Sequence, residues 1–275
     1  MTIYHQTDLV TLYQGDCLEV MPQLEARSFD CILADLPYGK TQCKWDSVIP
    51  FEPLWEQYKR LIKQNGAIVL FGIQPFTTDL IMSNREWFKY CWVWEKDNPS
   101  NFGNCQYMPM KYHEDIVVFG KKTIQFNPQM RDVGKVSNVG GFKTSSLVSF
   151  KTPVKSIPQN TTTFRYPSTI LRFDRPKHNS SDQQIHPTQK PIALLEYLVK
   201  TYTNEGDMIL DNTCGSGSLL VAARNTNRRA VGIEMDEGYC RIAAGRLGRF
   251  EPSEFEVDKK AVEGQLGLFG AIACL

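Results

Sequence analysis

The residues that point most directly to a chemistry are Asp35-Leu36-Pro37-Tyr38, which follow a short apolar run from Phe29 to Ala34. Such a run, ending at a carboxylate, is typical of a buried parallel strand whose carboxyl end faces the ligand-binding edge of an open α/β sheet. An exocyclic amine on an aromatic base is a poor nucleophile because its lone pair is delocalised into the ring. Asp35 can accept one N–H of such an amine, and the carbonyl of Leu36, held extended by the following proline, can accept the other. Tyr38 offers a ring face on which the base can stack.

A second group of residues forms a glycine-rich turn, Asp211 to Gly217, between a predicted strand and a predicted helix. Glycines allow a ligand to approach the backbone, and a helix N-terminus favours a negative group. The next predicted strand ends at Glu234, where a carboxylate can accept both ribose hydroxyls of a nucleoside. Asp211 is placed to hold an ammonium group. The two acids favour S-adenosylmethionine over a dinucleotide, whereas helix packing would explain Gly215 and Gly217 but neither acid.

The elements that must position these residues alternate between strands and helices, which predicts a doubly wound, mostly parallel α/β sheet. Besides the runs already named, the predicted strands are Ala67–Phe71, Tyr90–Trp94, Asp115–Phe119, Met208–Leu210 and Ala230–Ile233. The predicted helices are Pro53–Gln64, closed by Asn65-Gly66, then Pro75–Ser83, Pro191–Tyr202, Ser218–Arg224 and Glu237–Leu247. We expect a catalytic half at 1–120, an insert at 121–185, a cofactor-binding half at 186–250 and a C-terminal tail at 251–275.

Charge is distributed unevenly along the chain. Residues 121–178 hold eleven Lys/Arg against two Asp/Glu, a balance of +9, and the remaining residues hold twenty against twenty-eight, a balance of −8. This asymmetry indicates a polyanion-binding segment attached to a neutral-to-acidic core, although a solvated basic loop would have the same composition.

Composition limits the other classes of function. No apolar run approaches the roughly 20 residues that a membrane span requires, and residues 1–10 lack the apolar stretch of a signal peptide, so we expect a cytoplasmic enzyme. No two of the eight cysteines form a C-x-x-C pair, and none has zinc-ligand spacing, so we expect reduced thiols and no metal.

The catalytic tetrapeptide resembles the D-P-P-Y motif of amino-group DNA methyltransferases, in which aspartate usually accompanies adenine targets and serine accompanies cytosine-N4 targets. Leu36 departs from this motif, which has a proline there. Residues 186–191, His-Pro-Thr-Gln-Lys-Pro, closely resemble the H-P-T-Q-K-P motif of the same family, which lies by the methionine end of the cofactor. Residues 14–18 resemble the segment whose aspartate contacts the cofactor adenine. Trp94-Glu95-Lys96 and His113 to Val117 resemble further family segments less specifically.

The resemblance implies a class I methyltransferase fold, flanked by helices and carrying an inserted target-recognition region, with S-adenosyl-L-methionine as the cofactor. The implied catalytic residues are Asp35, Leu36, Pro37 and Tyr38. The implied cofactor-binding residues are Asp16, Cys17, Asp35, His186, Thr188, Lys190, Asp211, Thr213, Cys214, Gly215, Ser216, Gly217, Glu234 and Met235.

The order of the motifs resembles that of the circularly permuted β group, in which target recognition lies between the catalytic and the cofactor motifs. The basic insert occupies that place, where it should supply phosphate contacts, which position DNA, and some base readout. The candidate DNA-binding residues are Lys121, Lys122, Arg131, Lys135, Lys143, Arg165 and Arg172.

The expected reaction is methyl transfer to N6 of an adenine flipped out of double-stranded DNA, by direct in-line attack without a covalent enzyme intermediate. Cytosine-N4 methylation is the first alternative. An RNA adenine methyltransferase and a non-catalytic DNA-binding protein of the same fold are further alternatives. A carbon-5 cytosine methyltransferase is excluded because it needs a cysteine after proline, and no Pro-Cys occurs in the chain.

The tail ends in Gln265-Leu266-Gly267-Leu268-Phe269, which resembles the peptide by which bacterial replication and repair proteins dock on the sliding clamp. A tail that packs its apolar residues on the core would have the same sequence. Dimers occur in the family, so a homodimer is compatible with the resemblance.

Overall fold

A computed structural model of the chain describes residues 2–39, 47–134, 163–176 and 189–248. These residues form two compact units. The first contains the residues up to Asn127 and those from Thr169 onward, and the second contains Pro128–Ser168.

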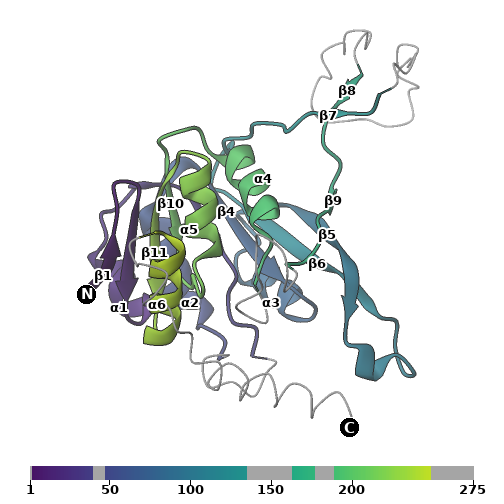
Figure 1. Cartoon of the computed structure of the whole chain (residues 1–275), viewed down its shortest axis with the longest axis horizontal. Coiled ribbons are helices and arrows are strands. Elements are labelled where there is room, and N and C mark those ends of the chain that lie inside the picture. The colour runs from purple at the N-terminus through teal and green to yellow at the C-terminus, as the bar shows by residue number, and fades with distance from the viewer. Residues whose placement is uncertain (1, 40–46, 135–162, 177–188, 249–275) are drawn as a thin grey trace. The chain divides into compact units, whose positions relative to one another are not determined.

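The first unit is built on a nine-stranded sheet (Figure 1). In spatial order its strands are β1 (Thr2–Gln6), β2 (Val10–Gln14), β11 (Arg229–Glu234), β10 (Met208–Asp211), β3 (Phe29–Ala34), β4 (Ile62–Gly72), β6 (Lys111–Phe119), β5 (Phe88–Ser100) and β9 (Ile170–Arg172). The five strands from β2 to β4 run parallel, and β6 pairs antiparallel with both β4 and β5. The predicted mostly parallel α/β fold is therefore confirmed.

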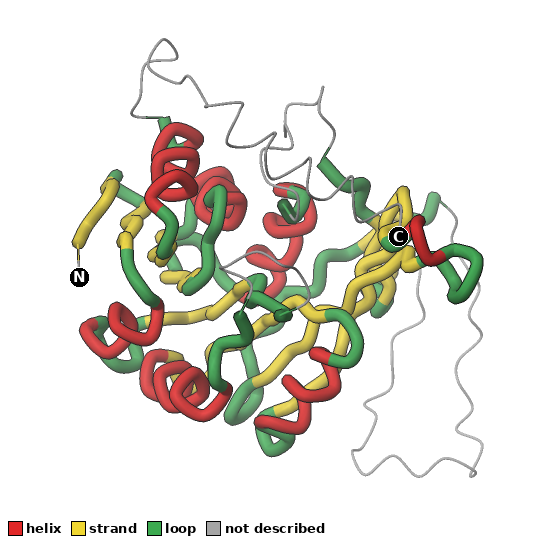
Figure 2. The backbone as a smooth tube through the Cα atoms, turned by 90° about the horizontal axis from the view of Figure 1, so that it is seen from below, coloured by secondary structure: helices red, strands yellow, loops and turns green. Residues whose placement is uncertain are grey.

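Helices cover both faces of the sheet (Figure 2). One layer contains α4 (Ile192–Tyr202), α5 (Ser218–Asn225) and α6 (Glu237–Arg246), and the other contains α1 (Cys17–Val20), α2 (Phe51–Leu61) and α3 (Phe76–Ser83). Side chains alternate between the two layers along each central strand: Cys31 and Leu33 of β3 join one core cluster, and Ile32 and Ala34 join the other. Burial on both faces explains why this strand reads as a continuous apolar run.

The predicted end of the helix at Pro53–Gln64 is wrong. The helix α2 ends at Leu61, and β4 begins at Ile62, so Asn65-Gly66 lies inside a strand and not at a helix C-cap. A Cβ atom at Gly66 would lie 2.8 Å from the carbonyl oxygen of Asp30, at a point where the register of β3 against β4 shifts. Glycine is required here because the two strands approach closely at an irregular point of their pairing. In the sequence alone, a glycine required for this reason looks the same as one that caps a helix.

Two further features differ from the sequence prediction. The hairpin of β1 and β2 at the sheet edge was not predicted, and β5 and β6 extend well beyond Tyr90–Trp94 and Asp115–Phe119. Their extension forms a hairpin whose tip includes the short 3-10 helix Phe102–Asn104 (Figure 1, lower right). The strand predicted at Ala67–Phe71 also begins five residues earlier, at Ile62, and the remaining predicted elements are confirmed to within two residues at each end.

In the second unit, β7 (Arg131–Asp132) pairs antiparallel with β8 (Phe164–Arg165). The described residues 121–127 and 169–176, at either end of the predicted insert, group with the first unit. None of the described helices is long and apolar enough to cross a membrane.

Candidate active site

A cavity of about 520 Å³ lies at the carboxyl edge of the parallel strands. Each of four neighbouring strands ends in an acid that lines it: Asp16 follows β2, Asp35 follows β3, Asp211 ends β10 and Glu234 ends β11. Parallel strands bring their carboxyl ends to one edge of a sheet, so residues far apart in the sequence meet there.

The loop after β3 is held by side-chain hydrogen bonds. The Tyr38 hydroxyl donates to Asp35 Oδ1 at 2.5 Å, and the Tyr38 ring packs on Phe76 with 5.0 Å between ring centroids. The Thr213 hydroxyl donates to the Asp35 carbonyl at 3.1 Å, which ties the loop to the glycine-rich turn. Leu36 is 3% exposed and belongs to the core cluster beneath α2, so an apolar side chain anchors the loop at the position where the family motif has proline.

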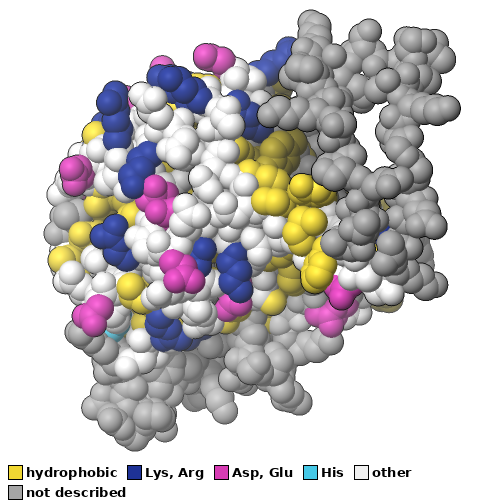
Figure 3. Space-filling view, turned by 90° about the horizontal axis from the view of Figure 1, so that it is seen from above, with side chains coloured by type: hydrophobic (Ala, Val, Ile, Leu, Met, Phe, Trp, Pro, Cys, Tyr) yellow, Lys and Arg dark blue, Asp and Glu magenta, His cyan; other side chains and the backbone are white. Residues whose placement is uncertain are grey.

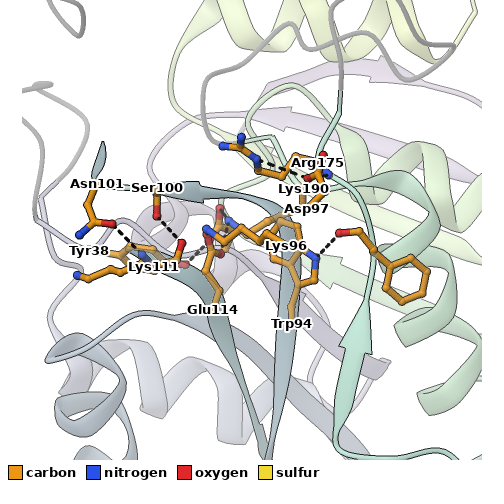
Figure 4. Close-up of polar contacts among 12 residues, drawn as sticks. Tyr38, Trp94, Lys96, Asp97, Ser100, Asn101, Lys111, Glu114, Arg175 and Lys190 are labelled. Atoms are coloured by element: carbon orange, nitrogen blue, oxygen red, sulfur yellow. Dashed lines mark hydrogen bonds and ion pairs between the residues drawn. The ribbon is translucent and has the colours of Figure 1, made fainter. Parts of the chain in front are cut away.

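The second oxygen of Asp35 accepts a hydrogen bond from Lys190, which begins a chain of alternating charges (Figure 4). Lys190 Nζ lies 3.5 Å from Glu114 Oε2, and Lys96 Nζ donates to Glu114 Oε1 at 2.7 Å. The side chains of Lys190 and Lys96 are 6% and 5% exposed. Buried charges are tolerated when they are paired, and these four groups sum to zero net charge.

The charge chain shifts the pKa values of three of its members. Burial raises the pKa of Asp35, and the positive charge of Lys190 opposes that rise. Burial alone would lower the pKa of Lys190, but Asp35 and Glu114 outweigh it and raise the pKa. Burial alone would raise the pKa of Glu114, but Lys190 and Lys96 together lower it. Lys190 and Glu114 therefore both keep their charges.

The part of the cavity that Asp211 and Glu234 line is acidic. Burial raises the pKa of Asp211 to about 8, and the neighbouring charges of Asp35 and Glu234 add to the rise. Within the described part of the chain, no basic side chain forms an ion pair with Asp211 or Glu234. Burial also raises the pKa of Glu234, although its oxygens accept backbone N–H groups of Gly215 at 2.8 Å and Asp236 at 2.9 Å. Buried carboxylates that lack a cation fit a ligand that brings its own positive charge, as S-adenosylmethionine does.

The two glycines of the turn, Gly215 and Gly217, are required for different reasons. Gly217 has φ +76°, and a Cβ atom there would lie 2.8 Å from the Cβ of Ala243, so this glycine serves helix packing. Gly215 has φ +50° with open space around the position of a Cβ atom, and it lines the cavity. Its left-handed conformation directs its N–H toward Glu234.

The cavity brings together most of the predicted site residues. Those that line it are Asp16, Cys17, Asp35, Leu36, Pro37, Tyr38, Lys190, Asp211, Thr213, Cys214, Gly215, Ser216, Glu234 and Met235. Gly217 does not line it, and His186 and Thr188 lie outside the described residues.

Sequence reasoning assigned no role to several residues that line the cavity. The charged ones are Lys96, Glu114, Lys111 and Arg175. Lys96 and Glu114 stand in segments that resemble family motifs, and this was the available signal. The contact of Glu114 with Lys190, and that of Lys96 with Glu114, depend on the pairing of β5 with β6.

The candidate DNA-binding residues are divided between the two units. Lys121, Lys122 and Arg172 belong to the first unit, Arg131 and Arg165 face each other across β7 and β8 in the second, and Lys135 and Lys143 lie outside the described residues. The guanidinium of Arg172 is paired with Glu95 at 2.7 Å. Figure 3 shows Lys and Arg side chains interspersed with Asp and Glu over one face.

Comparisons with known proteins show the family to which the chain belongs. Residues 29–245 match the N6_N4_Mtase family model, described as DNA methylase. The chain is 29% identical to the DNA adenine methyltransferase YhdJ of Escherichia coli (strain K12), over 93% of this chain and 90% of YhdJ. It is 27% identical to the type II methyltransferase M.HpaI of Haemophilus parainfluenzae, over 85% of this chain and 72% of that protein.

Solved structures share the fold at low sequence identity. The PvuII cytosine-N4-specific DNA methyltransferase aligns with a TM-score of 0.65 at 13% identity, over 92% of each chain. The M1.HpyAVI complex with S-adenosylmethionine (SAM) aligns with a TM-score of 0.57 at 22% identity, over 86% of this chain and all of that chain. The family match spans most of the chain, and the fold and acidic cavity fit the cofactor. The chain therefore belongs to the N6/N4 DNA methylase family and is a DNA methyltransferase that uses S-adenosylmethionine.

Proposed function

We propose that this enzyme methylates N6 of an adenine that is extruded from double-stranded DNA into the cavity, with residues 35–38 as the catalytic loop. The observation that carries the proposal is the Asp35 carboxylate, which is bound to Lys190 at the carboxyl edge of the sheet and still has one quarter of its side chain exposed. That exposed part leaves lone pairs available to an incoming amino group.

In the proposed reaction, Asp35 accepts one N–H of the amino group and the Leu36 carbonyl accepts the other, which localises the nitrogen lone pair. The bound cofactor supplies the electrophilic methyl group. Tyr38 releases its hydrogen bond to Asp35 and stacks on the base, and Lys190 keeps the carboxylate oriented while Tyr38 moves. Direct attack would form the N–CH3 bond as the S–CH3 bond breaks, so S-adenosylhomocysteine would leave and no covalent intermediate with the protein would form. The proton that the methylated amine must lose would pass through Asp35 to solvent.

For the cofactor, we propose that Asp211 receives the ammonium of the methionine moiety and Glu234 the ribose hydroxyls. Both carboxylates line the same end of the cavity, and their raised pKa values would fall when a cation binds. Asp16, Cys17, Thr213, Cys214, Gly215, Ser216 and Met235 complete the proposed cofactor site, with His186, Thr188 and Lys190 at its methionine end. Gly217 is proposed to act only through the packing of the turn.

Adenine is proposed over cytosine because Asp35 begins the catalytic loop, as in the adenine-specific branch that the tetrapeptide resembles. The relative YhdJ, which carries the printed name of an adenine methyltransferase, supports the same choice. Digestion of DNA from a host expressing the gene should yield N6-methyladenine, and sequencing of native DNA should reveal the site. Recovery of N4-methylcytosine instead would show that the enzyme methylates N4 of cytosine, the first alternative.

The motif order supports a β-group arrangement in which residues 121–185 recognise the target. We propose that Lys121, Lys122, Arg131 and Arg165, together with Lys135 and Lys143 outside the described residues, contribute phosphate contacts. The salt dependence of DNA binding tests this, since each phosphate contact removed should reduce the slope of log K against log salt by about 0.9.

The C-terminal tail, which also lies outside the described residues, is proposed to dock on a bacterial sliding clamp through residues 265–269. A peptide covering residues 262–271 should bind a purified clamp with micromolar or tighter affinity. Absence of binding at that level would leave packing on the core as the better account of the tail.

A further inference from the structure

The tip of the β5–β6 hairpin, residues 101–110, exposes an unusual concentration of apolar side chains. Phe102 is 73% exposed and Tyr107 is 85% exposed, and Met108 and Met110 between the tip and β6 are also exposed. Single exposed apolar residues are ordinary on protein surfaces, but a cluster of large ones on one protruding element marks an interaction site.

The tip has a defined conformation. Asn101 adopts a left-handed φ of +65°, and its side-chain oxygen accepts the backbone N–H of Lys111 at 2.8 Å, which closes the base of the tip (Figure 4). The backbone of the short helix adds bonds from Asn104 to Asn101 at 3.0 Å and from Met108 to Asn104 at 3.1 Å. The aromatic rings are therefore presented by a preformed turn, which lowers the entropic cost of binding.

The tip is continuous with the active-site cavity. Ser100 and Lys111 face each other across the base of the hairpin, and both line the cavity that contains Asp35. A duplex that delivers a base into this cavity must lie across its mouth, and the hairpin rises from that mouth. Residues 98–110 contain no charged side chain, so the tip suits the faces of bases better than phosphates.

We propose that this hairpin tip is a DNA wedge, in which Phe102 and Tyr107 stack on the bases that are left exposed when the target base leaves the helix. Inserted apolar side chains replace the stacking that extrusion removes, and they thereby lower the cost of holding the base in the cavity. The inference rests on the proposed extrusion of the target base.

The test compares two substrates and two kinds of variant. The substrates are a fully paired duplex carrying the mapped site and the same duplex with an abasic site opposite the target base, which reduces the cost of extrusion. The variant is Phe102→Ala combined with Tyr107→Ala. Ile3→Ala, on β1 at the opposite edge of the sheet and 50% exposed, is the matched control for the loss of an exposed apolar side chain.

The double variant should lose at least tenfold in kcat/KM on the paired duplex and should stay within about threefold of the wild type on the abasic duplex. Ile3→Ala should be unchanged on both. Equal losses on both duplexes, or no loss on either, would overturn the wedge. A wild-type dimer that becomes a monomer in the double variant during sedimentation would assign the tip to a second copy of the chain, which also overturns it.

Fluorescence of 2-aminopurine at the target position separates this inference from the proposed function. The wild type should raise the fluorescence on binding, and the double variant should raise it less on the paired duplex. A wild-type enzyme that methylates DNA without any rise would contradict extrusion itself, whereas equal rises for both proteins contradict only the wedge.

Discussion

The part of the cavity around Asp35 and the part around Asp211, our proposed catalytic and cofactor ends, surround their carboxylates with different charges. At the catalytic end, Asp35 is bound to a buried lysine, whose own charge is balanced by Glu114 and Lys96. At the cofactor end, Asp211 is buried with other acids nearby, and its pKa rises to about 8. One site contains its own counter-charge, and the other gains one only when a cation binds.

This difference fits the different tasks that we propose for Asp35 and Asp211. A carboxylate that must accept hydrogen bonds from a neutral amine has to be ionised before the base arrives, so a resident cation is useful. A carboxylate that must bind an ammonium would lose that attraction if a lysine already occupied it. On the proposed assignment, the cost of burying the Asp211 charge in the free protein is offset by the positive charge of the bound cofactor.

The largest expected effect comes from removing the paired carboxylate. Asp35→Ala should lower kcat by about 10³-fold, because the amine loses its principal hydrogen-bond acceptor. The affinity for S-adenosylmethionine, measured by calorimetry, should change by less than about threefold, since the cofactor contacts assigned to Asp211 and Glu234 remain. Near wild-type methylation by this variant would remove Asp35 from the mechanism.

Removing Lys190, the cation that is bound to Asp35, should have the next largest effect. Lys190→Met should lower kcat by about 10- to 100-fold through loss of a charge-assisted hydrogen bond. Because Lys190 opposes the rise in the Asp35 pKa, its loss should also move the acid limb of the pH–kcat profile to higher pH.

Lys190→Arg is the control, since it keeps the positive charge. It should recover part of the kcat and move the acid limb part of the way back to its wild-type position. Thermal unfolding should verify that each variant is folded. If Lys190→Met only raised the Kd of the cofactor and left the acid limb in place, Lys190 would belong to the cofactor site alone.

At the other end, Asp211→Asn should weaken cofactor binding about tenfold or more and yet stabilise the free protein. The unfolded Asp211 has a pKa of roughly 3.9 and the folded one about 8, so between these values the folded state holds a proton that the unfolded state has lost. Stability of the wild type therefore falls as pH rises through this window.

The stabilising effect of Asp211→Asn should consequently be small near pH 4.5 and largest at or above pH 8. We expect on the order of 1 kcal/mol or more there, or about 2–4 °C in Tm, measured by thermal unfolding at several pH values. An advantage of the variant that does not change with pH would contradict the assigned pKa.

The sequence predicted the acids at the strand ends because each follows a recognisable apolar run, and sheet geometry then places them together. It did not predict the partners of Asp35. The link from Lys190 to Glu114 and Lys96 depends on the antiparallel pairing of β5 with β6, and the length of these strands exceeds what their apolar residues indicated. Gly66 shows the same limit, because a close approach between strands and a helix cap both call for glycine.

The smallest expected effect concerns the outer pair of the charge chain. Glu114→Gln leaves Lys96 buried without its ion-pair partner, and Lys96→Met leaves Glu114 with Lys190 as its remaining cation, so each single variant should lose stability and several-fold in kcat. The double variant removes both charges and keeps the pair of Lys190 and Asp35. It should therefore be less impaired than the sum of the two single variants, by about 0.5–3 kcal/mol in a double-mutant cycle on unfolding free energy. Strict additivity would mean that Lys96 and Glu114 act independently, and that the counter-charge of Asp35 is Lys190 alone.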